Sequence, residues 1–263
     1  MEGPETAPTL KLNKSAALQQ VCDIAFVLAH RVRHDLRRYP SDTPAKRVVA
    51  YWFSKAAKSF AAAVLLWNQG YWQDAAVLSR TILEVSLQSL LFRKEPEKFA
   101  PQFFKHAEVQ KHRLFADMDK HAEGEIKAGI ASYFERLGLN PSDIEKWKNW
   151  WGKDGTIWDL AKEIEARQTY QVQYPALSFL VHGAPSAFSY YVLKTGPREY
   201  IDWDWEAGAP SASTYSLAET MFSAAPLSLL DVIAVLGELW GLDYDADLQA
   251  AREAVERYNK EYV

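Results

Sequence analysis

The spacing of apolar residues predicts a chain built almost entirely of helices. Between residues 45 and 67 the apolar positions recur at steps of four and three, the repeat of one helix face: Ala45, Val49, Trp52, Ala56, Phe60, Ala63 and Trp67. After a turn at Gly70, an antiparallel helix is expected from Tyr71 or Trp72 to Phe92. Similar patterns predict helices over residues 15–38, 96–120, 125–137, 141–151, 156–166, 174–183, 211–239 with a break at Pro226, and 246–258. We therefore predict an all-α, multi-helix bundle.

One short stretch departs from the helical repeat. Ile201, Trp203 and Trp205 alternate with acidic residues, and this period of two is typical of an extended strand. A turn containing Gly196 precedes the stretch. The pattern predicts a minor β-hairpin near residues 190–206.

The chain shows no internal repeat and no long linker that would divide it. We expect a disordered leader over residues 1–13 and a single helical domain over residues 14–263. Three tryptophans of the middle third, Trp147, Trp150 and Trp151, are expected to pack this part of the chain over the bundle as a lid.

Two charged residues interrupt the apolar surface of the 71–92 helix. Arg80 and Glu84 lie four residues apart, on the same helical line as Ala76, Leu87 and Leu91. This spacing predicts that they pair directly. Two interpretations are open: a structural ion pair that holds the helix against its neighbours, or a guanidinium that binds an anionic ligand while the carboxylate positions it or acts as a base.

A second polar group repeats this spacing further along the chain. Tyr174, Ser178 and His182 follow one another at intervals of four within an apolar run, so their side chains share one helix face. His182 could be a core residue or a general acid or base. A Ser-His hydrolase is not expected, because Ser178 does not lie in a Gly-x-Ser-x-Gly turn.

Charge and composition limit the classes of partner. The net charge is −4 and the pI about 5.9, which argues against binding duplex DNA through a general basic surface. A basic cluster over residues 30–38 is either a solvated helix end or an anion site. Lone Cys22 and the absence of a secretion pattern at the start favour a cytoplasmic protein. Asp231 and Glu238 interrupt the longest apolar run, 221–240, which favours a buried helix over a membrane span.

Metal and phosphate motifs are weak or missing. The 96–120 helix offers His106, Glu108 and His112, with Glu108 and His112 one turn apart, a spacing that can bind a metal. However, lysine and arginine residues surround them and no His-Glu-x-x-His motif is present. The Gly-rich signatures of nucleotide-binding loops are missing as well. We therefore expect no metal and no cofactor.

The order of these motifs resembles a known family. Gly70, then Arg80-x-x-x-Glu84 on one helix and Ser178-x-x-x-His182-Gly183 further on, is similar to the bacterial helical domain-of-unknown-function family 5677. The resemblance covers about residues 45–190 and implies that the four polar residues are the positions to test. A looser similarity links the chain to HEPN-type helical domains, which bind nucleotides or cleave RNA, although Arg and His do not share one motif here.

Taken together, these features favour a binding or regulatory module for an anionic ligand, in a prokaryotic or phage accessory or defence setting. The binding residues would be Arg80, Tyr174, Ser178 and His182. One alternative is a HEPN-like, metal-independent endoribonuclease with Arg80, Glu84 and His182 as its catalytic residues. Another is a structural or oligomerising protein. The expected partner is an anionic small molecule or RNA, with no membrane, and a homo-oligomer is left open.

Overall fold

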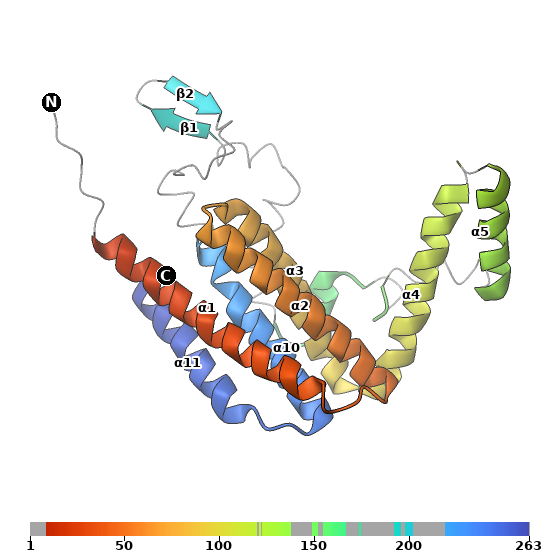
Figure 1. Cartoon of the computed structure of the whole chain (residues 1–263), viewed down its shortest axis with the longest axis horizontal. Helices are drawn as coiled ribbons and strands as arrows, with labels where there is room; N and C mark the ends of the chain where they lie inside the picture. Colours follow the sequence, from red (N-terminus) through yellow and green to blue (C-terminus); the bar gives the residue numbers. More distant parts are fainter. Residues whose placement is uncertain are drawn as a thin grey trace.

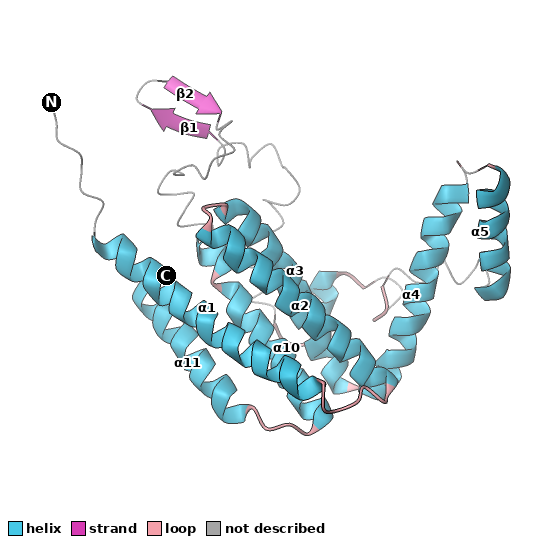
Figure 2. Ribbon diagram, in the orientation of Figure 1, coloured by secondary structure: helices cyan, strands magenta, loops and turns pink. Residues whose placement is uncertain are grey.

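The computed structural model describes residues 9–119, 121, 123–137, 149–151, 155–166, 174, 192–195, 198–201 and 219–262. Within these residues the chain forms eight helices and two short strands (Figures 1 and 2). The helices are α1 (Thr9–Leu36), α2 (Pro44–Asn68), α3 (Trp72–Lys94), α4 (Pro96–Asp119), α5 (Gly124–Leu137), α7 (Ile157–Glu163), α10 (Ala224–Trp240) and α11 (Asp245–Tyr262). The all-α fold class expected from the sequence is confirmed.

Local sequence signals set the ends of the central helices. Thr43 caps α2 by accepting a hydrogen bond from the Lys46 backbone N–H at 3.2 Å, and Pro44 occupies the first helical position, where a missing N–H costs nothing. Gly70 has a positive φ of 84°, which glycine adopts without strain, and so reverses the chain between α2 and α3. The predicted antiparallel pair of helices is therefore present.

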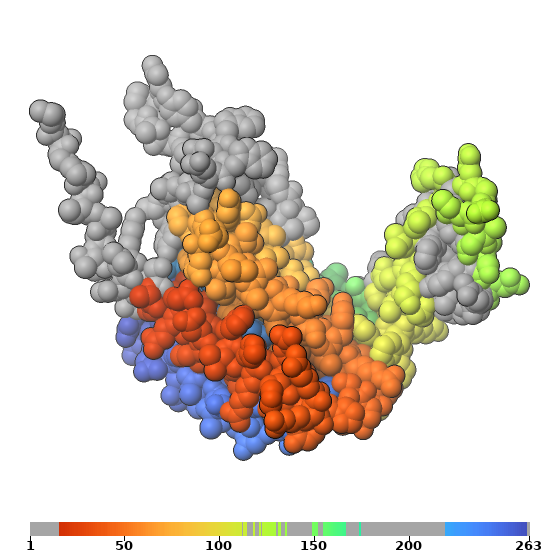
Figure 3. Space-filling view, viewed as in Figure 1, coloured from red at the N-terminus to blue at the C-terminus, as the bar shows by residue number. Residues whose placement is uncertain are grey.

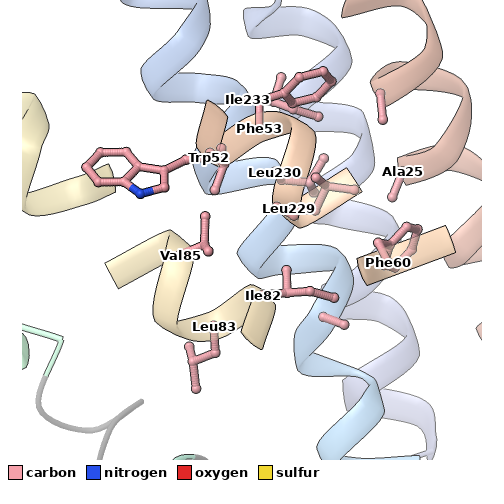
Figure 4. Packing of buried hydrophobic residues seen from close by; sticks show 14 of the residues in the cluster. Ala25, Trp52, Phe53, Phe60, Ile82, Leu83, Val85, Leu229, Leu230 and Ile233 are labelled. Atoms are coloured by element: carbon pink, nitrogen blue, oxygen red, sulfur yellow. The ribbon is translucent and has the colours of Figure 1, made fainter. Parts of the chain in front are cut away.

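Three helices form the centre of the bundle, and two more cover it. Helix α10 packs between α2, α3, α11 and α1, while α1 and α11 lie side by side (Figure 1). The core is filled by large apolar side chains from the central helices, among them Trp52, Phe60, Ile82, Leu229 and Ile233 (Figure 4). Burying side chains of this size contributes about 1.5–3 kcal/mol each to folding.

The break in the last apolar segment lies at Ser223 and not at Pro226. Residues 219–222 are helical, a turn follows at Ser223, and Pro226 sits in the first turn of α10. The prediction of a break at Pro226 was wrong, because first-turn N–H groups have no helical partner and a proline is tolerated there.

The middle third meets the bundle through two tryptophans, Trp150 and Trp151, and through apolar side chains of α7 such as the fully buried Leu160. Trp150 is buried, its ring lies 5.4 Å from that of Trp52, and its Nε1 donates to Gln88 at 2.9 Å. Helix α5 instead packs on α4, away from the bundle (Figure 1). The expected packing over the bundle is thus confirmed for Trp150 and Trp151 and wrong for α5, while Trp147 lies outside the described residues.

The two strands, β1 (Val192–Thr195) and β2 (Arg198–Ile201), pair antiparallel with Val192 opposite Ile201. Trp203 and Trp205 lie outside the described residues, so the hairpin over 190–206 stays a prediction. The division into a leader and a single helical domain stays a prediction too. Helix α1 begins at Thr9.

Two helices are long and apolar enough to cross a membrane by length and composition, Trp72–Lys94 and Glu219–Trp240. Their most apolar windows are 61% and 78% buried inside the bundle, and core helices of soluble proteins meet the same criterion. The acidic interruptions of the second segment are paired with arginines: Asp231 with Arg252 and Glu238 with Arg93. These helices therefore give only weak support for a membrane location.

Candidate functional site

The arginine and glutamate of α3 form a direct ion pair. Arg80 Nε donates to Glu84 Oε1 at 2.9 Å across one helical turn, so the predicted pairing is confirmed. The helix positions both groups through its own geometry, because residues four apart lie above one another on its surface. Ala76, Leu87 and Leu91, which share this line, are fully buried.

The third member of the group comes from a distant part of the chain. The Tyr174 hydroxyl accepts a hydrogen bond from Arg80 Nη2 at 2.9 Å and donates one to Glu84 Oε1 at 3.1 Å. The Arg80 guanidinium also lies 4.9 Å from the centroid of the Tyr174 ring, within the range of a cation–π contact. We call these three residues the Arg80 cluster. The Arg80 guanidinium is therefore held in place by Glu84 at Nε and by Tyr174 at Nη2.

The Arg80 cluster is only partly buried. The Arg80 side chain keeps 16% of its surface exposed and the Glu84 side chain 30%. The apolar residues on the same helical line are fully buried, so the exposure is confined to the polar pair. An ion pair that stays in contact with water has a smaller desolvation cost than a fully buried one. A solute can also reach it from the solvent.

The electrostatics of the cluster favour a charged arginine and a neutral tyrosine. Burial by itself lowers the pKa of Arg80, but attraction to Tyr174 and Glu84, with their hydrogen bonds, outweighs it and raises that pKa above its ordinary value. Burial and the nearby charge of Glu84 raise the pKa of Tyr174, against the opposing effect of Arg80. Tyr174 therefore keeps its proton at neutral pH, and its hydroxyl donates a hydrogen bond to the carboxylate.

Two of the predicted site residues cannot be placed. Ser178 and His182 lie outside the described residues, so their distance from Arg80, and any catalytic or binding role for them, stays a prediction. The structure brings together Arg80, Glu84 and Tyr174 from the predicted set.

Two of the possible metal ligands of α4, His106 and Glu108, have protein partners. Glu108 Oε1 accepts from Lys111 at 2.8 Å, and His106 Nε2 lies 3.0 Å from the amide of Gln110. Among the residues that the structure describes, no group of three or more His, Cys, Asp and Glu side chains is arranged to hold a metal ion.

A second polar cluster joins the central helices α3 and α10 to α11 and was not identified from sequence. Asp231 on α10 accepts from Ser86 of α3 at 3.1 Å and from Arg252 of α11 at 2.9 Å. Burial raises the pKa of Asp231 despite the opposing effects of Arg252 and Ser86. The sequence signal was an acid in an apolar run, but its partners lie on other helices. We assign this cluster to the packing of α3, α10 and α11.

Comparison with known proteins gives one match. Residues 46–200, more than half of the chain, match the model of a family of unknown function, DUF5677. No curated protein and no solved structure matches the chain. The matched region contains the whole Arg80 cluster and also residues 178 and 182.

Proposed function

The chain belongs to this DUF5677 family, and we propose that it is a binding or regulatory module for an anionic small molecule recognised at Arg80. The observation that carries the proposal is the orientation of the guanidinium. Glu84 fixes its Nε side and Tyr174 one amino group, while the side chain keeps contact with water. A pre-oriented arginine loses little conformational freedom when it binds a carboxylate or phosphate.

The other parts of the cluster suit this role. Glu84 holds the arginine in place, and the neutral Tyr174 hydroxyl can form hydrogen bonds with both charged partners. We include Ser178 and His182 in the proposed site because of their spacing from Tyr174, and we propose a cytoplasmic location. The accessory or defence setting in a prokaryote or phage rests on the family resemblance alone.

The test is a binding titration with named anions. Inorganic phosphate, nucleoside 5′-monophosphates and short dicarboxylates would be titrated calorimetrically against the wild type, Arg80→Lys and the control Arg93→Gln. Arg93 lies on the same helix, and its ion pair with Glu238 is half exposed. We expect binding of at least one anion, weakened about tenfold or more in Arg80→Lys, which keeps the charge but loses the planar fork. Failure of every anion to bind, or equal binding by Arg80→Lys, would contradict the proposal.

The ribonuclease alternative needs a separate assay, because it depends on His182. Purified protein would be incubated with single-stranded RNA in the presence of a chelator. Cleavage that disappears in His182→Ala, with the fold intact by circular dichroism, would replace the binding module by a metal-independent nuclease. We expect no cleavage, since Arg and His do not share the single motif of HEPN-type domains.

A further inference from the structure

A groove runs along the outer surface between α1 and α2, away from the Arg80 cluster. It contains two adjoining hollows of about 320 and 280 Å³, which share Phe26 and Ala61. The lining residues extend along α1 from Cys22 to Arg33, a length of about 16 Å at 1.5 Å per residue. The two helices lie next to each other on the face shown in Figure 3. We call this surface the α1–α2 groove.

The floor of the α1–α2 groove is shallow and apolar. Ala29, Ala57 and Ala61 bring the helix backbones close to the surface, and Phe60 and Phe53 are buried beneath them. Small side chains at such positions let another helix approach closely.

Exposed apolar side chains also line the groove, next to this floor. Phe26 is 44% exposed, and Leu65, at the far end of the groove, is 65% exposed. Exposed apolar groups that line a hollow, rather than being scattered singly over the surface, mark interaction sites.

The charges of the groove are separated along its length. His30, Arg33 and Lys58 line one end, and Asp23 lines the other. Neighbouring Arg31 is paired with Asp247, whereas among the described residues no ion pair involves Arg33 or Lys58. The protein carries a net charge of −4, so this positive end of the groove is a local feature of its surface. It complements the charge of an acidic partner.

We propose that the α1–α2 groove docks an acidic amphipathic helix of a partner protein. The apolar face of that helix, with residues at intervals of three and four, would cover the alanine floor, and its acidic residues would face Arg33 and Lys58. A single alkyl chain fits less well, because it would remain half exposed in an open groove. A helix, which is about 10 Å wide, would cover the groove and contact both α1 and α2.

Peptide selection tests this directly. A displayed library of helical peptides would be selected on the wild-type protein, and enriched peptides would be measured by fluorescence anisotropy. The groove variants are Ala61→Arg, which fills the floor, and the double change Arg33→Glu with Lys58→Glu. The control is Lys55→Glu, an exposed lysine of α2 that does not line the groove. Circular dichroism melts check that each variant is folded.

We expect enriched peptides to be acidic and amphipathic. Both groove variants should weaken their binding about tenfold or more, and Lys55→Glu should change it less than twofold. Three results would overturn the proposal: no enriched peptide, peptides without an acidic face, or peptides that bind the groove variants as well as the wild type. Displacement of the peptide by single-stranded RNA would assign the surface to nucleic acid instead. A dimer lost in Ala61→Arg would assign it to a second copy.

Discussion

Replacing Glu84 with Gln tests how much the Arg80 cluster contributes to folding. The change removes the negative charge and keeps the shape and one acceptor. Removing one partner of a fully buried pair costs about 3–5 kcal/mol, and exposed pairs with this spacing contribute about 0.3–0.5 kcal/mol. With Arg80 16% and Glu84 30% exposed, the cluster lies between these limits. We therefore expect a loss of about 1.5–2 kcal/mol in the free energy of unfolding, as interpolated from these classes.

The assay is chemical and thermal unfolding followed by circular dichroism. A loss of this size corresponds to about 5 °C in the melting temperature of a domain of this length. The matched control is Glu108→Gln, whose partner Lys111 is 54% exposed, and it should cost less than about 0.5 kcal/mol.

A double-mutant cycle identifies the cause of the loss. Tyr174→Phe removes the hydroxyl that bridges Arg80 and Glu84 but keeps the ring against the guanidinium. Because this hydroxyl donates to the carboxylate, Glu84→Gln and Tyr174→Phe should couple by about 1 kcal/mol. A coupling near zero would refute the cluster. A cost above about 3 kcal/mol for Glu84→Gln would favour a purely structural pair over the proposed binding site.

Two further predictions concern the packing of the bundle. Trp150→Ala should reduce the free energy of unfolding by about 4 kcal/mol, because the ring is buried against Trp52 and a cavity would remain; urea unfolding measures this, and a loss below about 1 kcal/mol would contradict the packing. Asp231→Asn should gain stability relative to the wild type as the pH rises from about 4 to 7. The folded state raises the pKa of Asp231, so it binds the proton more tightly than the unfolded chain and loses stability when that proton leaves. Thermal melts of both proteins across this pH range measure the difference in stability between them. A difference that stays constant with pH would disprove the argument.

The sequence alone determined the features that depend on neighbouring residues. The repeat over residues 45–67 fixed α2, because a helix face recurs every three or four residues whatever surrounds it. Gly70 fixed the turn, since its positive φ is open to glycine without strain. The contact between Arg80 and Glu84 followed for the same reason, as their separation is set by the helix itself.

Only the tertiary structure decided which distant segments meet and how far each side chain is covered. Tyr174 reaches Arg80 across 94 residues of sequence, and no local pattern encodes that approach. The same holds for the partial exposure of Arg80 and for the packing of α5 on α4 instead of the bundle. Such contacts depend on the relative placement of whole helices. That placement is set by the sum of many weak packing interactions, none of which has a periodic signature in the sequence.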